Sequence, residues 1–384
     1  DEAELKAAGL IKMLGEEVDA TYLDLVKTVT VDPALVHEMS KEMKLVFTPL
    51  HGTGQMLGER ALKNAGFEGI YLVPEQAVAD PNFSTVKSPN PEEAGAFEYA
   101  IKLGTELDAD ILVATDPDAD RLGAAVRKVK GEYVVLTGNQ IASLMLDYLL
   151  RAKKAAGTLP ANGTALKSIV SSELPTAIAK SYGADMVDVL TGFKFIAEKI
   201  KQYEEDHSKE FLFGFEESYG YLAKPFVRDK DAIQALVLIA EVAAYYKKKG
   251  QTLYDGLVEI FETHGYYKEQ TISVTMSGIT GAEKIKALMA QFRTEAPADF
   301  AGIAVSITED FGNSTKTFSD GSTESIDMPS SNVLKYFLED GSWIAIRPSG
   351  TEPKIKFYIG AKAESQAAVD EKVAAFETSI RTLT

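Results

Sequence analysis

Residues 110–121 read Asp110-Ile-Leu-Val-Ala-Thr-Asp-Pro-Asp-Ala-Asp-Arg121, a short apolar run followed at once by three carboxylates and a guanidinium. The apolar run predicts a buried strand, so the aspartates would lie on a loop at a strand end. Carboxylates at alternate positions of a tight loop can converge on one Mg2+, which prefers oxygen ligands in near-octahedral geometry. The alternative is a solvated acidic turn. We therefore predict a metal site at Asp116, Asp118 and Asp120.

The spacing of this loop excludes a calcium site of the EF-hand type. Counted from Asp116, such a loop needs Gly at its sixth position and Glu at its twelfth. The sequence has Arg121 and Arg127 at these positions. The guanidinium of Arg121 instead indicates that an anion comes near the metal.

Length and composition limit the class of protein. The chain has 384 residues, of which 45% are hydrophobic and 25% charged, enough for two to four domains with cores of their own. It has no cysteine, which excludes disulfides and thiolate metal sites and fits a reducing cytoplasm. A net charge of -17 argues against nucleic-acid or anionic-membrane partners. Any anionic substrate must then be bound by local positive charge.

The sequence predicts neither a signal peptide nor a transmembrane helix. The opening residues Asp1-Glu-Ala-Glu-Leu5 are acidic, where a signal peptide would be basic and then apolar. The most apolar helical stretch, residues 232–246, is interrupted by Gln234 and Glu241 and falls short of the roughly 20 residues that a bilayer requires. We expect a soluble, cytoplasmic protein. The absence of an initiator methionine suggests that residues precede Asp1.

The first segment, residues 1–156, begins with a βαβ pattern. A strand at 44–48 leads through a loop with Gly52 and Gly54 into a helix and then a second strand at 69–73. A dinucleotide-binding fingerprint would need its third glycine at position 57, which is Leu57, so NAD binding is not expected. Further along, Ser88-Pro-Asn-Pro-Glu92 is predicted to be a structural turn.

The second segment, residues 157–267, again alternates strands and helices and carries three polar loops. Thr191-Gly-Phe-Lys194 stands at a helix start, where free amides and a lysine suit an anion. Glu216-Glu-Ser-Tyr-Gly220 follows a strand and could bind sugar hydroxyls or be a solvated corner. Arg228-Asp-Lys-Asp231 could be an internally paired charge cluster or a substrate contact.

The third segment, residues 268–384, changes to alternating apolar strands, which predicts an antiparallel sheet with helices. Asp340-Gly341 between two apolar runs is a strong hairpin signal. The next connection, Arg347-Pro-Ser-Gly-Thr-Glu-Pro-Lys354, offers a guanidinium, two hydroxyls and a glycine, as a phosphate site would, although a plain turn has a similar composition. The predicted fold class is α/β, with two consecutive three-layer mixed α/β domains followed by an α+β domain.

Three loops together resemble the signatures of the α-D-phosphohexomutase superfamily. They are Thr115–Arg121, Gly214–Gly220 and Arg347–Pro353, and they occur in the superfamily's order. Other motifs look more like the bacterial phosphoglucomutase and phosphomannomutase branch: Thr48–Gly54, Thr191–Lys194 and Arg228–Asp231. The resemblance implies a four-domain enzyme, of which these residues match domains II, III and IV. The motif Thr-Ala-Ser-His-Asn-Pro, which carries the phosphorylated serine in domain I, does not occur here, so we expect this chain to lack the serine domain.

The resemblance also implies roles for individual residues. Asp116, Asp118 and Asp120 would hold Mg2+ together with a phosphoserine oxygen, and Arg121 would neighbour the transferring phosphate. Lys230 would contact substrate or transfer a proton. Glu216 and Ser218 would contact sugar hydroxyls, and Thr191 and Gly192 would select sugar orientation. Four residues would hold the non-transferring phosphate: Arg347, Ser349, Gly350 and Thr351.

The implied activity is the interconversion of glucose 1-phosphate and glucose 6-phosphate through a phosphoserine and a bisphosphorylated sugar. The isolated chain is expected to be inactive. Mannose, pentose or glucosamine phosphates are alternative substrates, because the sugar loop does not distinguish them. Two other readings stay open, a non-catalytic binding remnant and a Mg2+-dependent phosphatase built on the aspartate loop. The oligomeric state is not predicted.

Overall fold

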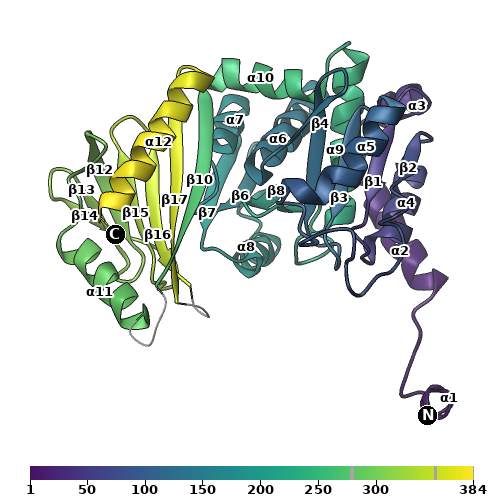
Figure 1. The fold of residues 1–384 in the computed structure, drawn as a ribbon, viewed down its shortest axis with the longest axis horizontal. Coiled ribbons are helices and arrows are strands. Elements are labelled where there is room, and N and C mark those ends of the chain that lie inside the picture. The colour runs from purple at the N-terminus through teal and green to yellow at the C-terminus, as the bar shows by residue number, and fades with distance from the viewer. Residues whose placement is uncertain (277–280, 350–352, 384) are drawn as a thin grey trace. The chain divides into compact units, whose positions relative to one another are not determined.

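The computed structural model describes residues 1–276, 281–349 and 353–383 (Figure 1). The described residues form mixed α/β structure in the first two thirds of the chain and a large antiparallel sheet in the last third. The helices are α1 Glu2–Ala7, α2 Glu16–Lys27, α3 Pro33–Met39, α4 Gly54–Ala65, α5 Glu98–Leu107, α6 Gly138–Ala155, α7 Leu174–Tyr182, α8 Phe193–Asp206, α9 Ala232–Lys248, α10 Leu253–His264, α11 Gly281–Thr294 and α12 Gln366–Leu383. No helix in these parts of the chain meets the length and hydropathy that a transmembrane segment needs.

The first sheet has the strand order β2-β1-β3-β4-β5. Its strands are β1 Leu45–Thr48, β2 Ile70–Leu72, β3 Ile111–Thr115, β4 Leu122–Val129 and β5 Glu132–Val135. The first three are parallel, which confirms the βαβ unit, and β4 returns antiparallel beside β3.

Helices cover both faces of this sheet. On one face, Val46 and Leu112 pack against Ala100 of α5. On the other, Gly58 of α4 leaves room for Phe47 and for Leu236 of α9, since a Cβ at Gly58 would lie 2.8 Å from the ring of Phe47 and 3.1 Å from Leu236. The result is a three-layer sandwich, and the aspartate loop connects β3 to β4 at the edge of its central layer.

A second sheet follows in the chain. Its strands are β6 Gly163–Ser168, β7 Asp185–Val189, β8 Glu210–Glu216 and β9 Gly220–Leu222. Strands β8 and β9 form a tight antiparallel pair in which Glu216 lies opposite Gly220. This second α/β segment places the predicted sugar loop at the β8–β9 turn.

The last sheet is antiparallel and has the strand order β10-β17-β16-β15-β12-β13-β14, with β11 beside β12. Its strands are β10 Tyr266–Thr275, β11 Asp299–Phe300, β12 Ile303–Asp310, β13 Thr315–Phe318, β14 Thr323–Ser325, β15 Leu334–Leu338, β16 Trp343–Pro348 and β17 Lys354–Ala363. Gly341, at φ 84°, closes the predicted hairpin between β15 and β16.

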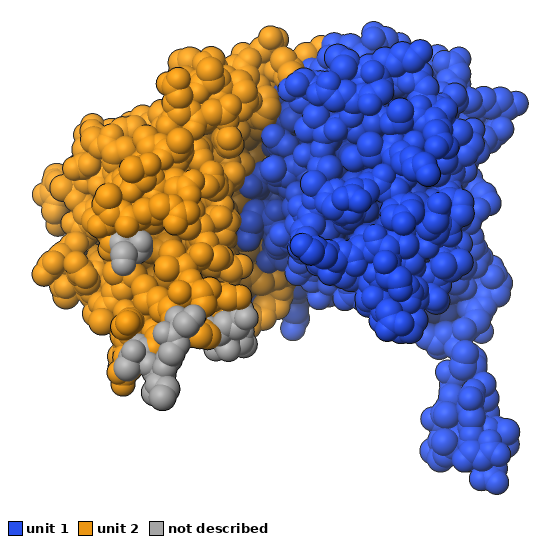
Figure 2. Space-filling view, in the orientation of Figure 1, with its two compact units in different colours: residues 1–165, 197–257 blue, residues 166–196, 258–384 orange. Residues whose placement is uncertain are grey.

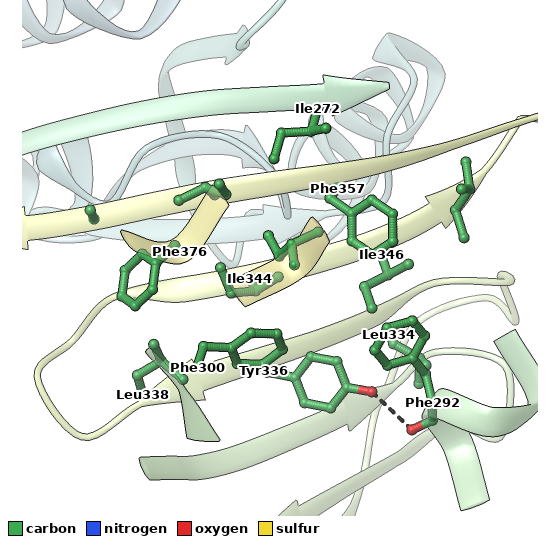
Figure 3. Close-up of a cluster of buried hydrophobic side chains, with 14 of the residues drawn as sticks. Ile272, Phe292, Phe300, Leu334, Tyr336, Leu338, Ile344, Ile346, Phe357 and Phe376 are labelled. Atoms are coloured by element: carbon green, nitrogen blue, oxygen red, sulfur yellow. Dashed lines mark hydrogen bonds between the residues drawn. The ribbon is translucent and has the colours of Figure 1, made fainter. Parts of the chain in front are cut away.

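Helices α11 and α12 bury one face of this sheet. Side chains from both helices, including Phe292 and Phe376, pack against Ile344, Ile346 and Phe357 of the strands (Figure 3). Tyr336 satisfies its buried hydroxyl by donating a 3.0 Å hydrogen bond to the carbonyl oxygen of Phe292 (Figure 3). Together the three sheets confirm the predicted fold class.

The chain divides into two compact units, shown in different colours in Figure 2. Unit 1 contains residues 1–165 and 197–257, and unit 2 contains residues 166–196 and 258–384. Within unit 2, Ile169, Val170 and Leu190 pack with Trp343 and Tyr358 of the last sheet. Residues 166–196 therefore share a core with the C-terminal part of the chain.

Candidate active site

The aspartate loop, residues 116–120, begins where β3 ends. Asp116 is 9% exposed, and its Oδ1 accepts hydrogen bonds from the backbone amides of Asp120 at 3.0 Å and Arg121 at 2.9 Å. These bonds close the loop on itself. One carboxylate oxygen from each of Asp116, Asp118 and Asp120 lies within 4.8 Å of the others. Such a set of hard oxygen donors fits Mg2+ and could hold it.

The electrostatics of the loop agree with a cation site. Burial is the largest cause that raises the pKa of Asp116, and the neighbouring charges of Asp120 and Asp118 raise it further. The backbone hydrogen bond from Arg121 opposes them, and the result is a pKa of about 7. Three carboxylates so close together therefore repel one another, and either a proton or a cation relieves the repulsion.

The loop at residues 51–54, which precedes α4, packs against the aspartate loop. The Thr53 amide donates to the carbonyl oxygen of Pro117 at 2.8 Å. A Cβ on Gly52 would lie 2.3 Å from the Cα of Pro117, and one on Gly54 would lie 2.7 Å from Oγ1 of Thr115. These glycines are thus required by close packing against the aspartate loop. His51, which precedes them, is held by Val78 and Thr85 through its two ring nitrogens, each at 2.8 Å.

Two cations flank the aspartates. Nζ of Lys230 lies 2.7 Å from a carboxylate oxygen of Asp120, and Nε of Arg121 lies 3.8 Å from the other. Burial would lower the pKa of Lys230, but the hydrogen bond and charge of Asp120, followed by the charges of Asp229 and Glu216, raise it above its ordinary value. Lys230 therefore carries a proton at neutral pH. Arg121 Nη1 also contacts Glu92 at 3.2 Å.

The predicted sugar loop, residues 216–220, lies beside the start of β4. The Leu122 amide donates to the carbonyl oxygen of Tyr219 at 3.0 Å, and Arg121 bridges to Gly220. Glu216 is 9% exposed, and a Cβ on Gly220 would meet both its Oε2 and the side chain of Lys230. Unit 1 therefore brings the predicted residues Glu216, Arg121 and Lys230 close to the three aspartates. Ser218 is half-buried in the same turn.

Helix α9 starts at this cluster. Asp231 caps the helix by accepting from the Ile233 amide at 2.9 Å, and it accepts the Tyr22 hydroxyl at 2.8 Å. The Ala232 amide donates to the carbonyl oxygen of Ala119 in the aspartate loop at 3.2 Å. The positive end of the helix dipole thus lies beside the carboxylates, where it favours their charged form or a bound anion.

Unit 2 holds the other predicted residues. Thr191 and Gly192 connect β7 to α8, and Gly192 has φ +116°, a conformation that favours glycine. Arg347 is half-buried at the end of β16, where it lies opposite Lys356 of β17. The Ser349 amide donates to the carbonyl oxygen of Lys354 at 2.8 Å. Gly350 and Thr351 lie outside the described residues.

Two contacts in the site could not be predicted from the sequence. Arg228 forms its ion pair outside the Arg228–Asp231 cluster, with Glu204, and donates to the carbonyl oxygen of Pro225. Lys230 pairs both inside the cluster, with Asp229 at 3.5 Å, and outside it, with Asp120 at 2.7 Å. Glu92, the partner of Arg121, was predicted only as part of a turn. Nothing in the local sequence around Glu92 signals this contact, because the two residues are brought together by the fold.

Comparison with known sequences identifies the family. Residues 20–131 match phosphoglucomutase/phosphomannomutase α/β/α domain II, residues 137–261 match α/β/α domain III, and residues 282–378 match the C-terminal domain. The three matches follow one another in the family's order and leave only short stretches of the chain unmatched.

Individual relatives also carry the name phosphoglucomutase. A phosphoglucomutase of Staphylococcus aureus (strain MRSA252) is 42% identical over 333 residues, which cover 86% of this chain and 59% of the relative. The chain thus spans about three fifths of the length of such relatives.

Solved structures share the fold. Parafusin, a phosphoglucomutase of Paramecium in its open form, has a TM-score of 0.66 at 19% identity, with 95% of this chain and 62% of that chain covered. A phosphoglucomutase/phosphomannomutase family protein of Burkholderia thailandensis has a TM-score of 0.60 at 16% identity, with 95% and 64% covered. The chain belongs to the phosphoglucomutase/phosphomannomutase family, within the α-D-phosphohexomutase superfamily.

Proposed function

We propose that these residues form the metal-binding and sugar-phosphate-binding part of a phosphoglucomutase-type phosphotransferase. The observation that carries the proposal is the convergence of Asp116, Asp118 and Asp120 beside Arg121 and Lys230. The reaction would interconvert glucose 1-phosphate and glucose 6-phosphate. Support for glucose comes from the relatives that are 42% identical and named phosphoglucomutase.

In the proposed reaction, the phosphorus–oxygen bond to a serine breaks while a bond to a sugar hydroxyl oxygen forms, and the hydroxyl proton ends on the released serine oxygen. The bisphosphorylated sugar then reverses its orientation and returns its other phosphate to the serine. Charge on the transferring phosphoryl group must be neutralised throughout. Arg121 supplies a guanidinium for this purpose. Mg2+, held by the three aspartates, would supply further neutralisation.

Lys230 and Glu216 have separable tasks in this scheme. Because the pKa of Lys230 is raised, its ammonium is present at neutral pH and can donate a proton or stabilise negative charge, whereas it is a poor base. Glu216 offers acceptors for sugar hydroxyls, with Ser218 in the same turn. Thr191 and Gly192 would contact the sugar, and Arg347, Ser349, Gly350 and Thr351 would hold the phosphate that is not transferred.

The proposed nucleophile comes from outside these 384 residues, which contain no Thr-Ala-Ser-His-Asn-Pro motif. We also propose that the segments 1–156, 157–267 and 268–384 correspond to domains II, III and IV. The family matches at 20–131, 137–261 and 282–378 support the order of these segments, and the domain III match begins within the first segment, at residue 137. A cytoplasmic location is proposed on the basis of the cysteine-free sequence.

Binding of glucose 1,6-bisphosphate to the 384-residue chain, followed by isothermal titration calorimetry, tests the substrate site. We expect Arg347→Ala to weaken binding at least about tenfold, because a charge-assisted phosphate contact is lost. Arg381→Ala is the matched control, since Arg381 pairs with Glu377 on an exposed helix face. Equal affinity of the Arg347→Ala variant and the parent chain would contradict the proposed phosphate site.

A further inference from the structure

A cavity of about 660 Å3 lies in unit 1 and shares no lining residue with the aspartate loop. Its walls come from the connection between α2 and α3, the C-terminal half of α6, and Lys224 and Tyr245. A second cavity of about 480 Å3 shares Leu149, Lys153 and Lys224 with the first. The two lysines therefore stand where both cavities meet, outside the site proposed for the phosphotransfer.

The charges that line the first cavity are unbalanced. They are the cations Arg151, Lys153 and Lys224 and the single carboxylate of Asp32. Arg151 is already paired with Asp147 at 2.8 Å. Among the described residues, neither Lys153 nor Lys224 has an ion-pair partner. Two neighbouring lysines without an ion-pair partner contrast with the net charge of -17 of the whole chain.

The charge imbalance affects the pKa of Lys224. Burial, and then the positive charge of Lys153, lowers the pKa of Lys224, and the charge of Glu210 offsets them only in part. Glu204, His207, Lys209 and Glu210 line the second cavity beside it, and Glu204 pairs with Arg228. An anion between Lys153 and Lys224 would remove their mutual repulsion.

The remaining walls suit the organic part of a ligand. Val29, Val31 and Leu149 provide apolar surface, and Tyr245 provides an aromatic ring. Thr30 also lines the cavity, and its Oγ1 has no hydrogen-bond partner within the described ranges. A rotation about χ1 would make this hydroxyl available to a ligand. The cavity thus combines a cationic end with an apolar wall, and its volume lies in the usual range for small-molecule sites.

We propose that this cavity binds a small organic phosphate, whose dianionic group lies between Lys153 and Lys224 and whose organic part contacts Leu149 and Tyr245. A phosphate monoester carries nearly two negative charges at neutral pH and offers three acceptor oxygens, which matches two ammonium groups that lack ion-pair partners among the described residues. A monocarboxylate would neutralise only one of them. The site is separate from the substrate site and would let the protein respond to a second phosphorylated compound.

Titration of the 384-residue chain with phenyl phosphate, monitored by calorimetry at low ionic strength, tests this proposal. Phenyl phosphate is expected to bind more tightly than inorganic phosphate, because its ring adds apolar contact. The double variant Lys153→Gln/Lys224→Gln is expected to bind it at least about tenfold more weakly, through loss of two charge-assisted contacts. Lys154→Gln is the matched control, since Lys154 is the next residue on the same helix and does not line the cavity.

Thermal unfolding of each variant establishes that the chain is folded, and Arg347→Ala identifies binding at the substrate site. Retained binding by Arg347→Ala, together with loss in the lysine double variant, supports the proposal. Unchanged binding by the folded double variant overturns it, as does a loss of binding caused by Arg347→Ala alone. Failure of the parent chain to bind phenyl phosphate at millimolar concentration also overturns it.

Discussion

Asp120 links the three-aspartate cluster of the candidate metal site to Lys230. Its carboxylate belongs to the three-aspartate cluster and also pairs with Lys230 at 2.7 Å. Asp120→Asn is expected to weaken Mg2+ binding at least about tenfold, because it removes both a hard anionic ligand and the group that orients Lys230. Calorimetric titration with Mg2+ measures the change. Binding by the parent chain is itself expected to be weak, since a phosphoserine oxygen would complete the site.

The control for this experiment is Asp229→Asn. Asp229 contacts Lys230 at 3.5 Å but is largely exposed and lies outside the aspartate cluster. Its replacement lowers the local negative charge by the same amount and should change Mg2+ affinity only slightly. Equal losses in the two variants would mean that general electrostatics, and not ligation by Asp120, determines the affinity.

Two buried lysines in unit 2 should respond in opposite ways to removal. Lys167 is fully buried and contacts Glu173 and Asp188 at 3.0 Å each. Lys335 is also buried, but its Nζ has no hydrogen-bond partner within the described ranges and lies over the rings of Phe337 and Trp343. Lys167→Met should therefore cost about 3–5 kcal/mol of unfolding free energy.

Lys335→Met is expected to be close to neutral or stabilising, because an apolar chain replaces an ammonium that lacks hydrogen bonds. Urea unfolding of both variants measures the difference. A loss for Lys335→Met as large as that for Lys167→Met would show that the longer contacts of Lys335 to Glu173, at 3.6 Å, and to Asp188, at 4.0 Å, are strongly stabilising.

Glu173 should make unit 2 sensitive to acid. Burial would raise the pKa of Glu173, but the charges of Lys167 and Lys335 and the hydrogen bonds from Lys167 and Thr176 lower it to about 2. A carboxyl group with a folded-state pKa below its unfolded value of 4.5 stabilises the fold above pH 4.5. That contribution, about 3 kcal/mol, is lost as the pH falls towards 2.

Measurement of unfolding free energy against pH tests this assignment. The stability difference between the parent chain and Glu173→Gln should shrink as the pH falls from 4.5 towards 2, because Gln does not titrate. A difference that stays constant over this range would mean that Glu173 does not carry the pH dependence.

At the scale of elements, the aspartate loop depends on the loop at residues 51–54. Gly52→Ala is expected to destabilise the chain by about 1–3 kcal/mol and to weaken Mg2+ binding, because the new Cβ would lie 2.3 Å from Pro117. Gly15→Ala is the control, since a Cβ there meets nothing within 4 Å. Unfolding midpoints and Mg2+ titrations of the two variants decide the matter, and unchanged Mg2+ binding by Gly52→Ala would separate the two loops functionally.

Local patterns predicted several elements correctly. The apolar run before the aspartates is β3, and Asp340-Gly341 is a hairpin. Each depends on residues adjacent in sequence. Strand β4 was not predicted, because its residues 122–126 are all buried and the sequence there lacks the apolar–polar alternation that indicates a strand. The full burial of Lys167 and Lys335 was also unpredictable, since lysine is normally a surface residue.

At the scale of the whole molecule, the division into units cuts across the order of the chain. Residues 166–196 belong with 258–384, although the sequence places them at the start of the second α/β segment. Their assignment follows from packing of Ile169, Val170 and Leu190 with Trp343, a contact between residues far apart in sequence. Patterns within a segment carry no information about such contacts. The loops that form the candidate site were recognised by motif, whereas the pairing of Arg121 with Glu92 required the fold.

The proposed division of labour places the metal, sugar and distal phosphate sites in these 384 residues and the nucleophilic serine elsewhere. The most direct test is an assay of the purified chain with glucose 1-phosphate, Mg2+ and glucose 1,6-bisphosphate, in which formation of glucose 6-phosphate is coupled to its oxidation. We predict no conversion by the chain alone, and conversion when the same residues are joined to a family segment that contains Thr-Ala-Ser-His-Asn-Pro. Conversion by the chain alone, abolished by Asp118→Asn so that a contaminant is excluded, would contradict the account.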